Sequence, residues 1–221
     1  MRVRRVVDLS VPVDAGTVVY PGDPAPRFEV HSTIRAQGFN LLSIHLGSQS
    51  GTHVDAPYHF EEDGSRVDEV PVDRFVGPGV VVDAPGLDPR AEITWEHVAP
   101  VADRIEPGVI VLLRTGWSAH YGAERYFEHP FLGADACQRM LDLGARSFCI
   151  DAINIDETPD DEHTGVGFPC HHLISRADGV IGENFALAEL PEGDFLVACT
   201  PIRLTGADGG PVRAVAIQLG A

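Results

Sequence analysis

Short runs of apolar and β-branched residues, separated by Gly, Pro and Asp, recur along most of the 221-residue chain. Runs of this kind are typical of β-strands. Strands are predicted at residues 4–9, 28–31, 41–46, 79–83, 109–113, 147–151, 180–183, 195–199 and 212–219. The run 109–113 is apolar at every position. It therefore predicts a central strand that is buried on both faces.

Two segments have the pattern of helices instead. Thr94 is placed as an N-cap with an acidic residue in the first turn after it, and the helix that follows is expected to kink or break at Pro100. Residues 135–143 predict a second helix, which ends at Gly144. The alternation of strand and helix in the middle of the chain predicts an α/β fold. Residues 1–221 contain no repeat or linker-like break, so one mixed-sheet domain is expected.

The composition excludes several classes of partner. Hydrophobic residues make up 44% and charged residues 22%, which is ordinary for a soluble globular protein. A net charge of −17 argues against nucleic acid or an anionic membrane as a partner. No run approaches the length of a membrane-spanning helix, and the first residues lack the apolar stretch of a signal peptide. We therefore expect a cytoplasmic protein that acts on a small molecule.

The four cysteines are also consistent with a reducing compartment. They are widely spaced, form no C-x-x-C pair, and are expected to be reduced and buried. Cys170, beside His171, is the one thiol whose position raises the question of a nucleophile. No third group that would orient it is evident, so a structural thiol is the expected reading.

Potential metal ligands are concentrated at His53, Asp55 and His59. All three occupy odd positions, so in an extended chain their side chains would point the same way. Imidazole and carboxylate are ligands for Zn²⁺, Mn²⁺ and Fe²⁺. A fully extended strand would carry His59 roughly 20 Å from His53, so one site requires the chain to turn. Pro57 favours such a turn, and the segment predicts a metal-binding corner between a strand and a loop.

Residues 49–59, Gln-Ser-Gly-Thr-His-Val-Asp-Ala-Pro-Tyr-His, resemble the signature of the metal-dependent cyclase family, which includes bacterial kynurenine formamidases and isatin hydrolases. That signature is His-x-Gly-Thr-His-x-Asp-x-Pro-x-His, and only its first position differs here, where Gln49 replaces His. Residues 21–24, 113–117 and 210–216 also look like family segments, so the similarity covers nearly the whole chain. The resemblance implies the family's swivelling β/β/α barrel-like fold.

A distant pair of ligands follows from the same resemblance. His171 and Glu183 are twelve residues apart, as are the family's distant His and Glu ligands. This spacing favours His171 over the adjacent His172.

The resemblance implies two ions that share one carboxylate. The residues carried over are Gln49, His53 and Asp55 for the first ion, and Asp55, His59, His171 and Glu183 for the second. The amide oxygen of Gln49 is neutral and hard, which suits manganese better than zinc. One or two ions, zinc or manganese, are therefore expected.

The implied chemistry is hydrolysis of a small, aromatic amide or lactam, as in the kynurenine formamidase step of tryptophan catabolism or in isatin hydrolysis. An open metal site supplies hydroxide near neutral pH and polarises a carbonyl. His59 is the candidate for proton transfer. The aromatic candidates for the substrate pocket are Tyr58, Phe60 and Trp117, together with Tyr20 and Phe168. Core packing is the alternative role for each of them.

Two other functions compete with hydrolysis. His53, Asp55 and His171 have the composition of the two-His-one-carboxylate set of iron(II) oxygenases, whose reaction requires dioxygen. Loss of the first ligand to Gln49 is also compatible with a catalytically silent metal-binding homologue. Family members commonly assemble as homodimers or homotetramers with the site near an interface, so self-association is expected as well.

Overall fold

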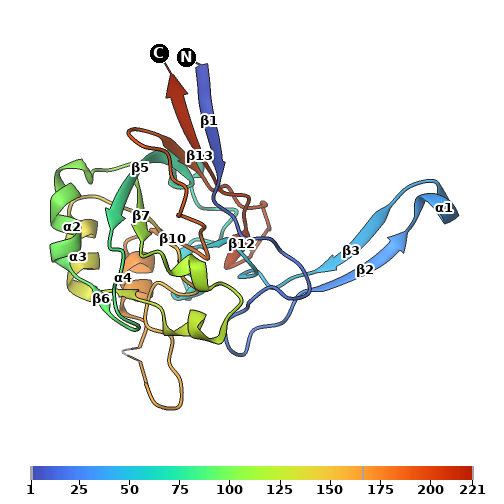
Figure 1. Cartoon of the computed structure of the whole chain (residues 1–221), viewed down its shortest axis with the longest axis horizontal. Coiled ribbons are helices and arrows are strands. Elements are labelled where there is room, and N and C mark those ends of the chain that lie inside the picture. The colour runs from blue at the N-terminus through green and yellow to red at the C-terminus, as the bar shows by residue number, and fades with distance from the viewer. Residues whose placement is uncertain (1, 166, 221) are drawn as a thin grey trace.

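A nine-stranded mixed sheet organises the computed structural model, which describes residues 2–165 and 167–220 (Figure 1). In sheet order its strands are β1 (Arg2–Asp8), β13 (Val215–Gly220), β11 (Leu196–Ala198), β5 (Val76–Asp83), β7 (Ile110–Arg114), β9 (Ser147–Ile150), β10 (Val180–Glu183), β4 (His53–Asp55) and β12 (Gly209–Pro211). The strands β5, β7, β9 and β10 run parallel to one another. All other neighbouring strands of this sheet are antiparallel. The α/β class with a mixed sheet is therefore confirmed.

The remaining elements are short. The helices are α1 (Ile34–Gln37), α2 (Trp95–Val98), α3 (Ala134–Asp142) and α4 (Pro169–Arg176). The 3-10 turns are η1 (Pro57–His59), η2 (Val72–Arg74), η3 (Ala99–Arg104), η4 (Trp117–His120) and η5 (Glu124–Glu128). Two small ribbons complete the chain, β2 (Arg27–Ser32) with β3 (Leu41–His45), and β6 (Glu92–Ile93) with β8 (Phe131–Leu132). No helix within the described residues has the length and apolar character needed to cross a membrane.

The central strands separate two hydrophobic cores. On β7, Val111 and Leu113 belong to the core that α2, α3 and α4 cover, whereas Ile110 and Leu112 belong to the core on the opposite face. All four side chains are fully buried, as the uniformly apolar run predicts. Helices α2, α3 and α4 lie together against one side of the sheet in Figure 1.

The opposite core is built largely from the sheet itself. Val54 on β4, near one end of the sheet, and Val197 and Ala216 on β11 and β13, near the other end, belong to the same buried cluster. Strands so far apart in the sheet can share a cluster only if the sheet curves around it. This curvature brings the antiparallel strand β4 and its ligand residues against the parallel centre.

The predicted strands are all present, with boundaries shifted by a few residues. The helix expected after Thr94 breaks as anticipated, because α2 gives way to the 3-10 turn η3 that contains Pro100. The helices α1 and α4 and the strand β12 have no counterpart in the sequence prediction. They are short, and the segment that forms α4, Pro-Cys-His-His-Leu-Ile-Ser-Arg, carries too brief an apolar pattern to be distinguished from a loop.

A buried histidine makes the stability of this fold dependent on pH. His129 donates from Nδ1 to the carbonyl of Pro130 at 2.9 Å and accepts at Nε2 from the Thr158 hydroxyl at 2.8 Å. Burial lowers the pKa of His129 to about 4. In the unfolded chain an imidazole titrates at about 6.5. Between these values the unfolded state binds more protons, so the folded state loses stability as the pH falls.

We predict that titration of His129 lowers the free energy of unfolding by about 3 kcal/mol as the pH falls from 6.5 towards 4. The variant His129→Gln preserves a donor and an acceptor. Its free energy of unfolding should fall by about 2 to 3 kcal/mol less than that of the wild-type protein between pH 7 and 4.5. Urea unfolding at the two pH values measures both proteins. An unchanged pH dependence in the variant would show that His129 is not the group responsible.

Candidate metal centre

Strand pairing places the first two candidate ligands together. In the antiparallel pair β4–β10, His53 is directly opposite Glu183, and paired residues project to the same face of a sheet. Nε2 of His53 lies 3.4 Å from Oε2 of Glu183 and 3.6 Å from Oδ1 of Asp55. All three side chains are buried. The pairing register thus joins residues that are far apart in the sequence.

The turn expected at Pro57 is present and brings His59 back to the same place. After Asp55 the chain leaves β4 and enters η1, in which Pro57 is the first residue and His59 the last. Asp55, His59 and His171 each offer a ligand atom within 4.8 Å of the others. His53, Asp55 and Glu183 form a second such group, so the two groups share Asp55.

His171 reaches the site from the first turn of α4. Its Nε2 lies 3.5 Å from Oε1 of Glu183 and 3.8 Å from Oδ2 of Asp55. Its Nδ1 donates to the fully buried carboxylate of Asp156 at 2.7 Å. Asp156 also accepts the backbone N–H groups of Cys170 and His171, so one carboxylate both caps the helix and orients the ring.

The same arrangement recurs at all three imidazoles. Nδ1 of His53 donates to the carbonyl of Gly51 at 2.9 Å, and Nδ1 of His59 donates to Asp208 at 3.0 Å. Each ring therefore keeps its lone pair on Nε2. Among the described residues, Nε2 of His53 and Oδ2 of Asp55 are buried without a hydrogen-bond partner. These two atoms have lone pairs that a divalent cation can accept, and they lie beside imidazoles of fixed orientation. The donor set therefore fits zinc or manganese.

Asn184 stabilises the two strand ends that carry His53 and Glu183. Its φ of 58° lies in the left-handed region, where Asn is among the better tolerated residues. The side-chain amide donates to the carbonyl of Gly51 at 3.1 Å, and the backbone carbonyl accepts from the Thr52 hydroxyl at 2.7 Å. Gly51 thus receives hydrogen bonds from both His53 and Asn184, which fixes the ring of His53.

Gln49 lies beside the ligands rather than replacing them. Its Nε2 donates to Oδ1 of Asp55 at 2.7 Å and is 3.4 Å from Nδ1 of His59. Its Oε1 is buried and has no partner among the described residues. The side chain of Gln49 is therefore hydrogen-bonded to the shared carboxylate of Asp55, and its Oε1 is available to coordinate a cation.

The charges in this cluster favour a cation. Burial opposes protonation of His53, but the nearby carboxylates of Glu183 and Asp55 raise its pKa to about 9. Burial likewise opposes protonation of His59, yet Asp55 and Asp208 raise its pKa to about 9. Burial also raises the pKa of Asp55. A bound divalent ion would supply the positive charge that protons supply otherwise.

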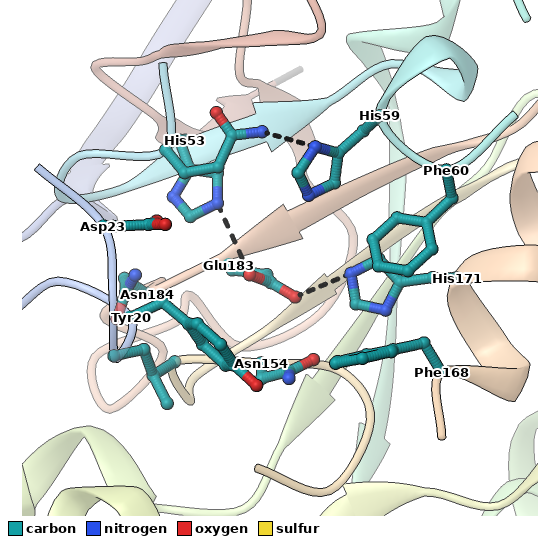
Figure 2. A pocket seen from close by; sticks show the side chains of 12 residues that line it. Tyr20, Asp23, His53, His59, Phe60, Asn154, Phe168, His171, Glu183 and Asn184 are labelled. Carbon is teal, nitrogen blue, oxygen red and sulfur yellow. Dashed lines mark hydrogen bonds and ion pairs between the residues drawn. The ribbon is translucent and has the colours of Figure 1, made fainter. Parts of the chain in front are cut away.

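A pocket of about 260 Å³ opens over the ligands. The aromatic rings of Phe60 and Phe168 lie 5.2 Å apart at its rim, and Phe60 also lies 4.3 Å from the ring of His171 (Figure 2). Its further lining residues are Tyr20, Asp23, Gln49, His53, His59, Ile153, Asn154, Glu183 and Asn184. The pocket therefore combines a polar, ligand-bearing floor with aromatic walls.

The structure separates the aromatic candidates. Phe60, Tyr20 and Phe168 line the pocket, whereas Tyr58 and Trp117 lie outside it. The ring of Tyr58 is covered by the guanidinium of Arg66, 4.2 Å from its centroid. Trp117 is buried in a separate cluster, where its indole N–H donates to the carbonyl of Tyr126 at 3.2 Å. Tyr58 and Trp117 are therefore not lining residues of this pocket, whereas the other three aromatic candidates are.

The two neighbours of His171 point elsewhere. The thiol of Cys170 lies in the core beneath α4 and donates to the carbonyl of Leu132 at 3.1 Å. The adjacent Cys137 thiol and burial raise the pKa of Cys170, which opposes any thiolate nucleophile. His172 is partly exposed and bonds to Glu61 at 3.0 Å.

Three polar residues at the site were not identified from the sequence: Asp23, Asp156 and Asp208. Asp156 and Asp208 each hold the Nδ1 of a candidate ligand, and Asp23 lines the pocket. Asp156 and Asp208 are both remote in sequence from the histidine whose Nδ1 they hold. Only a three-dimensional arrangement shows these relationships, because no local motif contains them.

Imidazoles and carboxylates at the floor of a pocket in an α/β fold fit the class of metal-dependent hydrolases. Residues 7–157 match the model of the Cyclase family, and the chain belongs to that family. This confirms the resemblance of residues 49–59 to the family signature.

Relatives and solved structures agree with this assignment over nearly the full length. The chain is 36% identical to a kynurenine formamidase of Paracidovorax citrulli, covering 96% of both proteins. It is 32% identical to a kynurenine formamidase of Bacillus cereus, covering 97% of this chain and 98% of that protein.

Two solved structures extend the comparison. Isatin hydrolase A from Labrenzia aggregata, bound to benzyl benzoate, superposes with a TM-score of 0.85 at 26% identity, covering 96% of this chain and 93% of that one. A structure titled a potential metal-dependent hydrolase with cyclase activity gives a TM-score of 0.79 at 28% identity, covering 98% and 99% of the two chains.

We predict that Asp156→Asn weakens metal binding. The variant keeps the size of the side chain but removes the charge that orients His171, and losses of this kind lower metal affinity by about 10- to 100-fold. Competition with a chromophoric chelator measures the affinity. Asp161→Asn, which removes an exposed acidic group, serves as the control. An affinity equal to that of the control would contradict the role assigned to Asp156.

Proposed function

We propose that this protein is a metal-dependent hydrolase that cleaves the C–N bond of a small aromatic amide. The observation that carries the proposal is a buried group of three oriented imidazoles and two carboxylates at the floor of an aromatic-walled pocket. The names of the relatives, kynurenine formamidase, agree with this chemistry. N-formyl aryl amines are therefore the first substrate class.

The proposed metal ligands are His53, Asp55, His59, His171 and Glu183, with Gln49 in reach of the same position. Bound there, zinc or manganese would lower the pKa of water and polarise a carbonyl oxygen. Two groups of ligands share Asp55, which is compatible with one or two ions.

The chain's own residues then bind and orient the substrate and move protons. Phe60 and Phe168 form an apolar wall against which an aryl ring can stack. Where an ion leaves His59 unbound, its Nε2 can accept or return a proton while Asp208 holds Nδ1. His53, Asp55, His171 and Glu183 are buried and His59 is half-buried, and this low exposure strengthens their electrostatic effect on a bound carbonyl.

A lactam is the second substrate class. It is favoured by the similarity to isatin hydrolase A, whose substrate by name is a cyclic aryl amide. The same polar floor would serve both reactions, since each requires attack of water on an amide carbonyl.

We further propose that the chain works as a homodimer or homotetramer. Exposed apolar side chains gather on the ribbon β2–β3, where a monomer would leave them in water.

We predict that protein purified without added metal contains zinc or manganese and hydrolyses N-formylkynurenine, with isatin as the alternative. Elemental analysis gives the metal content per chain, and both substrates are assayed with and without dioxygen. Formamide turnover without dioxygen supports the first class, and turnover confined to isatin supports the second. Protein that holds no divalent metal, or that turns over substrate only with dioxygen, would overturn the hydrolase proposal.

We also predict that Asp208→Asn lowers kcat by about 10-fold or more with little change in KM, because His59 loses the group that holds its ring. Asp194→Asn, at a fully exposed side chain, is the matched control. Steady-state kinetics with the best substrate measure both variants. A change confined to KM would show that Asp208 contributes to substrate binding instead.

A further inference from the structure

A tyrosine outside the pocket is linked to the metal centre by hydrogen bonds. Tyr126 lies in η5, and its side chain is fully buried in the cluster that also contains Trp117 and Ile153. Its hydroxyl donates to Oδ1 of Asn184 at 2.9 Å. Asn184 directly follows the candidate ligand Glu183 in the chain. Tyr126 does not line the pocket, so substrate binding does not account for this contact.

The other end of the Asn184 amide fixes the direction of this hydrogen bond. Nδ2 of Asn184 donates to the carbonyl oxygen of Gly51 at 3.1 Å. A carbonyl oxygen can only accept, so the amide must turn its N–H groups towards Gly51 and its oxygen towards Tyr126. The phenol of Tyr126 is therefore the donor. Burial raises the pKa of this phenol well above its usual value, so the hydroxyl keeps its proton.

The series of hydrogen bonds ends at a candidate metal ligand. The carbonyl of Gly51 also accepts from Nδ1 of His53 at 2.9 Å. A proton on Nδ1 leaves the lone pair of the imidazole on Nε2, where an ion can bind it. Three hydrogen bonds thus connect Tyr126 to His53 through Asn184 and Gly51.

Both backbone positions in this series are conformationally unusual. Gly51 has a φ of 67° and Asn184 a φ of 58°, which are values of the left-handed region. A residue other than glycine persists there where surrounding contacts hold it. The backbone of Asn184 is held on both sides, because its carbonyl accepts from the Thr52 hydroxyl and its N–H donates to the carbonyl of Ala152, each at 2.7 Å. Tyr126 adds the contact that holds the side-chain amide.

Burial makes each of these contacts matter. Tyr126, Asn184 and His53 are at most 2% exposed. In such surroundings a hydrogen bond is stronger than in water, and consecutive hydrogen bonds polarise one another. An acceptor that loses its donor there keeps the full cost of desolvation. Loss of the phenol hydroxyl therefore weakens the hold of the Asn184 amide on Gly51.

We propose that Tyr126 is a positioning residue of the metal centre, which acts on His53 through Asn184 and Gly51. The phenol orients the amide, the amide holds the carbonyl, and the carbonyl orients the imidazole ring. The inference rests on the proposed function only in taking His53 as a metal ligand. It concerns the affinity for the ion, so its test requires no turnover of substrate.

The test is the affinity of the full-length protein for Zn²⁺ and Co²⁺, measured by competition with a chromophoric chelator. Tyr126→Phe keeps the buried ring and removes only the hydroxyl. We expect this variant to bind both ions roughly 3- to 10-fold more weakly, which corresponds to the loss of one neutral hydrogen bond. The visible absorption of bound Co²⁺ should also shift, because the orientation of a ligand ring changes.

Tyr121→Phe is the matched control. The ring of Tyr121 packs against that of Tyr126 in the same cluster, with the two centroids 5.3 Å apart. This substitution also removes one hydroxyl, but one that lies outside the series of hydrogen bonds, and it should leave the metal affinity unchanged. An equal loss in both variants would assign the effect to packing of the cluster and overturn the proposal.

A double-mutant cycle tests the route through Asn184. Asn184→Gly removes the amide, and glycine adopts the left-handed backbone conformation without strain. This variant alone should weaken metal binding at least as much as Tyr126→Phe does. In the Asn184→Gly background, Tyr126→Phe should cause no further loss, because the connection is already broken. A full additional loss in that background would show that Tyr126 acts by another route.

A wild-type affinity in Tyr126→Phe would overturn this inference and leave the proposed hydrolase function intact. A wild-type chain without affinity for either ion would overturn both. Urea unfolding of the metal-free proteins measures separately what each substitution costs in stability. A loss of metal affinity that appears in Tyr126→Phe, and not in Tyr121→Phe or on top of Asn184→Gly, supports the positioning role.

Discussion

The pairing of β4 with β10 is the constraint on which the metal centre depends. It sets His53 opposite Glu183 and leaves Asp55 two residues along the same strand. Burying two carboxylates would be costly without a compensating charge. Among the described residues, the groups beside these carboxylates that can carry a positive charge are imidazoles. The Nδ1 atom of each imidazole is held by a hydrogen-bond acceptor. The site therefore brings oriented imidazoles and two buried carboxylates together, an arrangement that favours a bound cation.

Local patterns in the sequence were sufficient for most of the strands and for the turn at Pro57. Alternation and apolar runs are properties of neighbouring residues, and the phase of His53, Asp55 and His59 is likewise local. The family resemblance, rather than any pattern, connected His171 and Glu183 to them. Asp156 and Asp208 could not be predicted, because their roles arise from contacts between segments that meet only in the folded chain.

The aromatic residues illustrate the same limit. Tyr58 and Phe60 both adjoin His59, but the 3-10 turn that begins at Pro57 directs them to different environments. A sequence-based guess that treats neighbours alike cannot make this distinction. The ribbon β2–β3 shows a related limit. Its apolar alternation predicts two strands correctly, yet an uncovered apolar face has the same sequence pattern as one that packs on a core.

The position of β4 in the sheet also affects how the protein is made. This strand carries two of the candidate ligands, yet its neighbours β10 and β12 come from the last fifth of the chain. A ribosome adds the intervening residues in roughly ten to thirty seconds at ordinary rates of translation. During that interval both edges of β4 lack partners, and the site cannot hold an ion. The complete set of candidate ligands is therefore assembled only late in synthesis, and until then β4 is an unpaired strand that carries two ionisable side chains.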